Sequence, residues 1–220
     1  MKKTILIIAA AAFLFSNNCI AQNFKEVLTK TFIAFDSTQD FQKKMEQSNK
    51  LGLISKKYTD EWAAHYYNAY AKTSLSYMEK DEAKRDAYLD EAERERDEAV
   101  SLLKNENDET FVLAAMIANA RMAVKPQARW QKYGPLFEEN LKKAKEINEN
   151  NPRIYYLIGT SKYFTPKAFG GGKKVAQPYF EKAGGLFDKE ASEDITKPYW
   201  GKRANYYFYS ESKKEEEGEK

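Results

Sequence analysis

Few residues of this chain combine types and spacings that could support catalysis or metal binding. His65 is the only histidine, so a zinc ion there would need carboxylates as all its other ligands. The acidic pair Glu138 and Glu139 lies in a charged segment that offers no pocket for general acid–base catalysis. No nucleophile can be paired with a base from the residues present. We therefore expect no enzymatic activity, no metal site and no cofactor.

One glycine-rich run could bind an anion. Gly170, Gly171 and Gly172 precede Lys173 where a helix is expected to begin, and backbone amides at a helix start can hold a phosphate or a carboxylate. The run lacks the four-residue spacer and the Ser or Thr after lysine that a P-loop needs. Two interpretations remain open: an anion-binding loop of Gly170, Gly171, Gly172 and Lys173, or a turn that lets two helices cross.

The amino terminus predicts export. Lys2 and Lys3 precede an apolar run from Ile5 to Phe15, and the small residue Ala21 follows. This composition is typical of a secretory signal peptide covering residues 1–21, and the run is shorter than the roughly 20 residues of a membrane-spanning helix. Cleavage would remove the only cysteine, Cys19, and two lysines from a formal net charge of +3. We expect a nearly neutral mature protein without affinity for nucleic acid, located in the periplasm rather than secreted or lipid-anchored.

Apolar residues at helical spacing predict an all-α chain of about nine helices in one domain, residues 22–210, followed by a charged, disordered tail at 211–220. Phe24, Leu28, Phe32 and Phe35 show the pattern most clearly. The expected helices cover about 24–35, 41–58, 61–78, 81–104, 109–124, 127–150, 153–164, 173–188 and 199–210. Short connections between neighbouring helices favour antiparallel hairpins that stack on one another.

An internal repeat supports this stacking. Trp62, Phe111 and Tyr155 occupy the same place near the start of three helices, and Tyr155 is followed four residues later by the small residue Gly159. Alanines on the second helix of each pair are candidates for the helix crossing: Ala99, Ala144 and Ala183. In these features the chain resembles the tetratricopeptide-repeat (TPR) family, and it looks like periplasmic TPR-like proteins of undefined role. The resemblance implies a right-handed solenoid of helical hairpins, with longer units than the 34-residue family period.

The resemblance also implies a binding surface on the inner side of the first helices. The family's positions correspond here to Tyr67, Tyr70, Met116, Asn119, Tyr156, Thr160 and Tyr163. Tyrosines with an amide suit an extended peptide or a small amphipathic ligand, unless another helix covers them. The leading hypothesis is a non-catalytic scaffold for an envelope protein or peptide; the alternative is a small-ligand-binding accessory protein of a periplasmic uptake system. The sequence does not indicate an oligomeric state.

Overall fold

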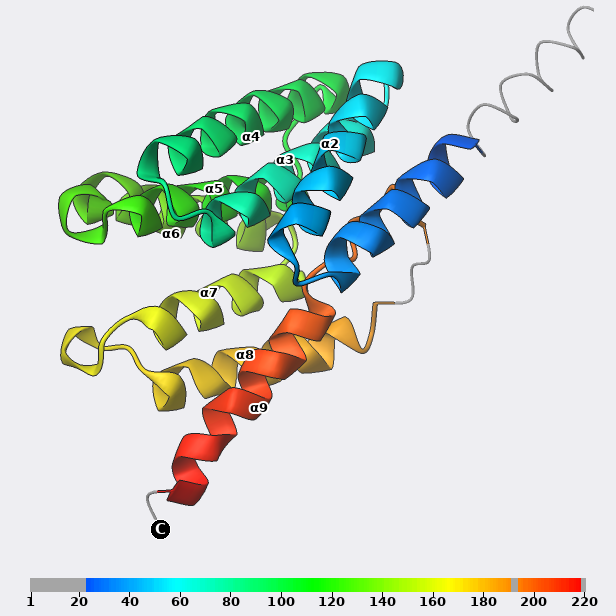
Figure 1. The fold of residues 1–220 in the computed structure, drawn as a ribbon. Coiled ribbons are helices and arrows are strands. Elements are labelled where there is room, and N and C mark those ends of the chain that lie inside the picture. Colours follow the sequence, from blue (N-terminus) through cyan, green and yellow to red (C-terminus); the bar gives the residue numbers. More distant parts are fainter. Residues whose placement is uncertain (1–22, 191–193, 219–220) are drawn as a thin grey trace, which may run out of the picture.

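The computed structural model describes residues 23–190 and 194–218, and in this part of the chain helices are joined by turns and loops, without a strand (Figure 1). This confirms the predicted all-α fold with about nine helices. The first described helix covers residues 23–37. It is followed by α2 (Phe41–Lys57), α3 (Trp62–Met78), α4 (Glu82–Leu103), α5 (Asp108–Val124), α6 (Pro126–Ile147), α7 (Pro152–Phe164), the short 3₁₀ helix η1 (Lys167–Phe169), α8 (Lys173–Phe187) and α9 (Lys202–Gly218).

Local sequence signals explain where several helices begin. Asp40 and Asp81 each accept a hydrogen bond from a backbone amide of the following helix, which satisfies a donor that has no partner inside the helix. Asn107 and Thr110 form a reciprocal capping box at the start of α5. Pro152 occupies the first turn of α7, where its missing amide hydrogen costs nothing.

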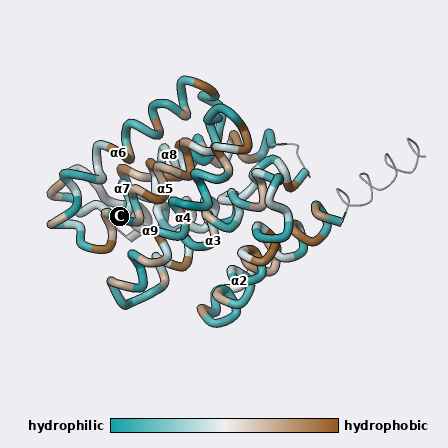
Figure 2. The backbone as a smooth tube through the Cα atoms, turned by 90° about the horizontal axis from the view of Figure 1, so that it is seen from above, coloured by the Kyte–Doolittle hydropathy of each residue, from teal (hydrophilic) through white to brown (hydrophobic). Residues whose placement is uncertain are grey.

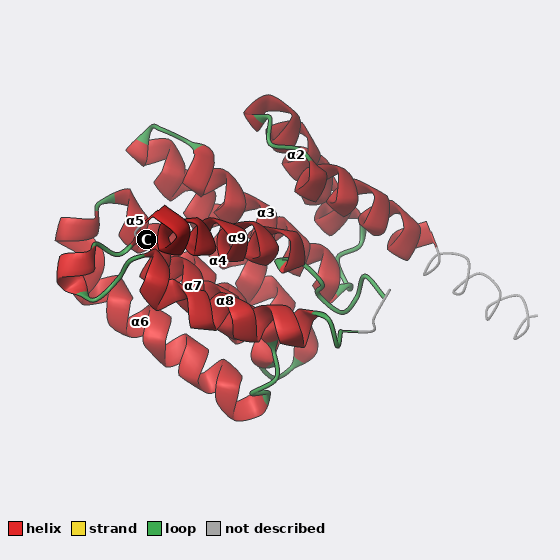
Figure 3. Ribbon diagram, turned by 90° about the horizontal axis from the view of Figure 1, so that it is seen from below, coloured by secondary structure: helices red, strands yellow, loops and turns green. Residues whose placement is uncertain are grey.

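The helices pair as three hairpins, α3–α4, α5–α6 and α7–α8. The first helices of successive hairpins also contact one another, α3 with α5 and α5 with α7, while α2 packs on α3 and α9 packs on α8 and α7 (Figures 1 and 3). The hairpins therefore stack in chain order. The right-handed superhelix of a complete TPR solenoid stays a prediction.

Small residues at the helix crossings allow close packing, as the repeat predicted. Ala99, Ala144 and Ala183 have no exposed surface. A Cβ atom on Gly159 would lie 2.6 Å from Cε1 of Phe180, so only glycine lets α7 approach α8 this closely. Most helices carry both apolar and polar residues along their length, as amphipathic helices around a shared core do (Figure 2).

One expectation differs from the structure, and one lies outside it. Helix α9 runs to Gly218, into the segment expected to be a disordered tail. The predicted signal peptide falls outside the described residues. Within them, no helix is both long enough and apolar enough to cross a membrane.

The Gly159 crossing can be tested by overpacking it. Gly159→Leu should lower the free energy of unfolding by about 1–3 kcal/mol, because the new side chain must displace the Phe180 ring. Glu138→Gln, an exposed change on α6, should alter it by less than about 0.5 kcal/mol. Urea titration followed by circular dichroism measures both. Equal shifts for the two variants would contradict the close α7–α8 packing.

Candidate ligand-binding site

One face of α7 carries three of the predicted binding residues. Tyr156, Thr160 and Tyr163 are four and three residues apart, so they lie on the same side of the helix. All three are partly exposed. Gly159, also on α7, packs against Phe180 of α8. This contact fixes the position of the face relative to α8.

Beside this face, rings from three helices form a connected aromatic cluster. The Tyr163 centroid lies 5.0 Å from that of Phe164 and 5.2 Å from that of Phe208 on α9. Phe180 of α8 stacks on Phe208, with centroids 5.8 Å apart and ring planes inclined by 14°. Tyr207 lies 5.4 Å from Phe208. We call Tyr163, Phe164, Tyr207 and Phe208, together with the ring of Phe180 that supports them, the aromatic face.

The aromatic face is buried at its base and open to solvent. Phe180 has no exposed surface, whereas Phe164 is 70% exposed and Tyr207 is 60% exposed. Soluble proteins rarely leave contiguous large apolar side chains in water unless the surface binds something. Aromatic rings held by a packed base can stack against a flat apolar molecule with little loss of side-chain entropy.

Two lysines border the aromatic face. Nζ of Lys173 lies 5.9 Å from the centroid of the Tyr163 ring. Lys214 on α9 interacts electrostatically with Tyr207 and Tyr163 and donates a hydrogen bond to Glu211, which lowers the pKa of the Glu211 carboxyl group. Because Glu211 balances Lys214, the border has a net positive charge from Lys173, which favours a flat ligand with anionic groups.

The structure corrects two predicted binding residues on α3. Tyr67 has no exposed surface, and its ring centroid lies 4.5 Å from that of Phe32 in helix 23–37. Tyr70 is 8% exposed and lies against Trp200, with centroids 4.7 Å apart. Both tyrosines are core residues, because helix 23–37 and the segment before α9 cover the inner side of α3. The possibility that another helix covers the predicted surface is therefore realised at these two positions.

Next to α7, the predicted positions on α5 form a polar edge. Met116 is buried, but its carbonyl oxygen accepts a hydrogen bond of 3.3 Å from the hydroxyl of Tyr77, which also donates to Oδ1 of the half-buried Asn119 at 3.0 Å. Tyr77 is 42% exposed and was absent from the predicted set. The helical spacing of Tyr77 from Trp62, Tyr66 and Tyr70 on α3 is the sequence signal that could have placed it beside them.

The amides of the glycine run are used within the loop. The amide of Gly170 donates to the Lys167 carbonyl oxygen at 3.1 Å, and that of Gly171 donates to the Pro166 carbonyl oxygen at 3.3 Å. The amide of Gly172 donates to the Lys162 carbonyl oxygen at 2.8 Å. These three bonds fold the run into a turn against α7, so its own amides are not available to an anion, and the anion-binding loop stays a prediction. Lys173 borders the aromatic face.

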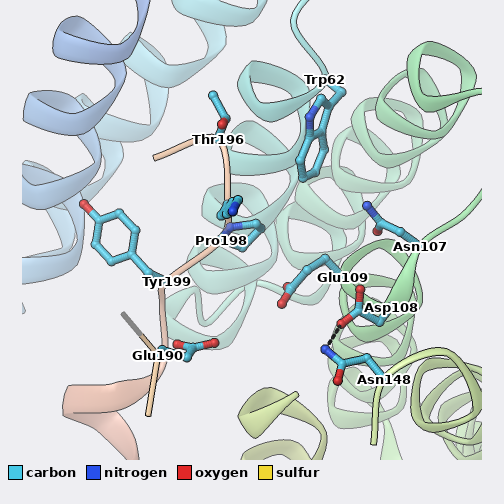
Figure 4. Close-up of a pocket in the computed structure, with 10 residues that line it drawn as sticks. Trp62, Asn107, Asp108, Glu109, Asn148, Glu190, Thr196, Pro198 and Tyr199 are labelled. Carbon is cyan, nitrogen blue, oxygen red and sulfur yellow. Dashed lines mark hydrogen bonds between the residues drawn. The ribbon is translucent and has the colours of Figure 1, made fainter. Parts of the chain in front are cut away.

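A polar cleft of about 320 Å³ lies at the other end of these helices (Figure 4). Its walls come from the starts of α3 and α5 and from both sides of the α8–α9 connection: Trp62, Asn107, Asp108, Glu109, Asn148, Glu190, Thr196, Lys197, Pro198 and Tyr199. Nδ2 of Asn148 donates to Asp108 at 2.8 Å.

Behind the cleft, a buried charge network joins the helices. Arg153 is 1% exposed and donates from Nη1 to Glu109 at 3.0 Å and to Glu190 at 2.7 Å. Glu109 also accepts from the Tyr66 hydroxyl at 2.8 Å, and that hydroxyl accepts from Nε1 of Trp200 at 2.7 Å. Burial raises the pKa of Glu109 despite the opposing effect of Arg153. The network ties the connection before α9 to α3, α5 and α7.

These features define a protein whose described residues form an all-helical fold with an exposed aromatic face on α7 and α9. No protein-family model matches the chain, and no curated protein does. Among solved structures it is similar to the HusA haemophore from Porphyromonas gingivalis, with 29% sequence identity and a TM-score of 0.69. The similarity covers 87% of this chain and 94% of that one.

Proposed function

We propose that the protein binds haem, or a closely related porphyrin, on the aromatic face and performs no catalysis on it. The observation that carries this proposal is the cluster of exposed rings on α7 and α9 above the buried Phe180. Haem is a flat aromatic macrocycle with two carboxylates, which suits stacked rings bordered by Lys173 and Lys214. The similarity to a haemophore supports the same ligand class.

Stacking of the rings, rather than coordination of iron, is the source of affinity in this proposal. His65 is buried on α3, where Nδ1 lies 2.8 Å from Glu95 and Nε2 lies 3.3 Å from the Thr59 carbonyl oxygen. These contacts hold the imidazole within α3 and α4, away from the aromatic face. If stacking is the source of affinity, iron-free protoporphyrin should bind about as well as haem.

The comparison favours the small-ligand alternative over a scaffold for proteins or peptides. A haemophore is a binding protein for a small ligand, and its similarity to this chain extends over nearly its full length. We place the protein in the cell envelope as an accessory protein of ligand uptake, supported by the composition of residues 1–21. We retain the TPR-like repeat as a proposal for its ancestry, supported by Gly159 and the three buried alanines at the hairpin crossings.

Truncating the two most exposed rings tests the site. The double variant Phe164→Ala/Tyr207→Ala should weaken porphyrin binding by about 10- to 100-fold, since each stacked ring contributes about 0.5–1.5 kcal/mol beyond the area it buries. Absorbance and fluorescence-quenching titrations with haem and iron-free protoporphyrin measure the two affinities.

Trp130→Ala is the matched control, because Trp130 is 57% exposed on α6, outside the aromatic face. It should leave both affinities unchanged, and unfolding curves should show all variants folded. If the double variant binds both porphyrins as the unaltered protein does, the ligand lies elsewhere. If only haem binds, coordination of iron outweighs stacking.

A further inference from the structure

The loop between α7 and α8 is built to hold one shape. Gly170 and Gly172 have φ angles of 77° and 111°, which side chains other than glycine rarely adopt. A Cβ atom on Gly171 would lie 2.1 Å from the Thr165 carbonyl oxygen. Together with the three amide hydrogen bonds that fold it back, these glycines give the loop a defined conformation at the end of the hairpin (Figure 1).

This ordered loop presents a large apolar side chain to water. Phe169, the last residue of η1, is 79% exposed, more than any other large hydrophobic side chain in the described part of the chain. Val175, in the first turn of α8, is 42% exposed. The ordered loop keeps Phe169 at the end of the hairpin, and a second surface that covered the ring would remove its apolar area from water.

The same tip is basic. No acidic residue occurs between Glu149 and Glu181, while Lys162, Lys167, Lys173 and Lys174 lie on or beside the loop. Helix α9, which packs on α8, does carry acids: Glu211 is ion-paired with Lys214, and the run Glu215–Glu217 follows it in the sequence. Lysines around an exposed aromatic side chain are the composition of proteins that rest on an anionic lipid surface.

We propose that the tip of the α7–α8 hairpin, residues 165–175, docks on a bilayer that contains anionic phospholipids. Phe169 enters the headgroup region, and the lysines contact the phosphate groups. A near-neutral chain has no attraction to lipid as a whole, but local lysines within a Debye length of the surface suffice. A stable protein interface needs about 1,000 Å² of buried area, whereas a fluid bilayer can close around a single exposed ring.

The experiment is co-sedimentation of the protein, purified from the cells that produce it, with vesicles of phosphatidylglycerol and phosphatidylcholine. We expect binding to mixed vesicles, weak binding to pure phosphatidylcholine, and loss of binding in high salt. Phe169→Ser should reduce the partition coefficient about tenfold. Lys174→Gln should reduce it about fivefold, as expected for one lysine near an anionic surface.

Trp130→Ser is the control for an exposed aromatic residue outside the tip, and it should bind vesicles like the unaltered protein. Equal binding to both lipids, no binding, or no effect of Phe169→Ser would overturn the proposal. So would concentration-dependent self-association that Phe169→Ser abolishes, because a second copy would then cover the tip.

Porphyrin titrations keep the two proposals separate. Phe169→Ser should retain porphyrin affinity. Loss of that affinity with vesicle binding intact would place Phe169 in the ligand site instead.

Discussion

Replacing Arg153 by methionine is expected to lower the free energy of unfolding by about 3–5 kcal/mol. The guanidinium group is almost completely buried and compensates the carboxylates of Glu109 and Glu190. Methionine fills much of the same volume, so the loss comes mainly from the uncompensated charge of Glu109 rather than from a cavity. Chemical denaturation followed by circular dichroism measures it.

The pH dependence separates this cause from a packing defect. Burial already raises the pKa of Glu109, and removal of Arg153 raises it further because the largest opposing charge is lost. The folded variant then holds a proton that the unfolded chain releases, so stability is present at low pH and lost as pH rises. The deficit should be smaller at about pH 5 than at about pH 8. Adding Glu109→Gln should recover part of it.

Arg94→Met is the matched control, since Arg94 is exposed on α4. Its effect should stay under about 0.5 kcal/mol. If the Arg153→Met protein is as stable as this control, the buried charges do not help to hold the α8–α9 connection against α3, α5 and α7.

Trp200→Ala is the second change with a large expected effect, about 3–5 kcal/mol of unfolding free energy. The indole is 2% exposed and packs 4.7 Å from the Tyr70 ring and 6.2 Å from the Tyr156 ring. Its removal leaves a cavity between α3 and α7, and the Tyr66 hydroxyl loses the hydrogen bond from Nε1.

Trp130→Ala again serves as the comparison, because the same truncation at a 57% exposed site should cost under about 1 kcal/mol. Urea denaturation of both variants gives the difference. Similar midpoints would mean that the segment before α9 is not part of the cooperative core, and Tyr70 would then be available to a ligand after all.

Much of the fold could be predicted because its signals are local. Helical spacing of apolar residues, the caps at Asp40 and Asp81, and the small residue Gly159 all act within one helix or one hairpin. The predicted stripe of Tyr156, Thr160 and Tyr163 also followed from one helix alone, and the structure places it on one face.

The remainder depends on contacts between distant parts of the chain. Tyr67 and Tyr70 have the spacing of groove residues, but Phe32 and Trp200, from opposite ends of the chain, cover them. Neither the pairing of Tyr163 with Phe208 nor that of Glu109 with Arg153 has a spacing rule in sequence, since each joins separate hairpins or helices. Long-range packing therefore decided which tyrosines became core and which became surface.

The position of Phe180 limits how this protein can diversify. One side of its ring fits against Gly159 at the helix crossing, and it also stacks on Phe208 in the aromatic face. Any substitution of Phe180 thus alters the hairpin and the aromatic face together, whereas changes at Phe164 and Tyr207 leave the α7–α8 crossing intact. Among descendants that adapt to ligands of other shapes, we expect selection to act first on those two outer rings, and residues 159 and 180 to change only as a pair.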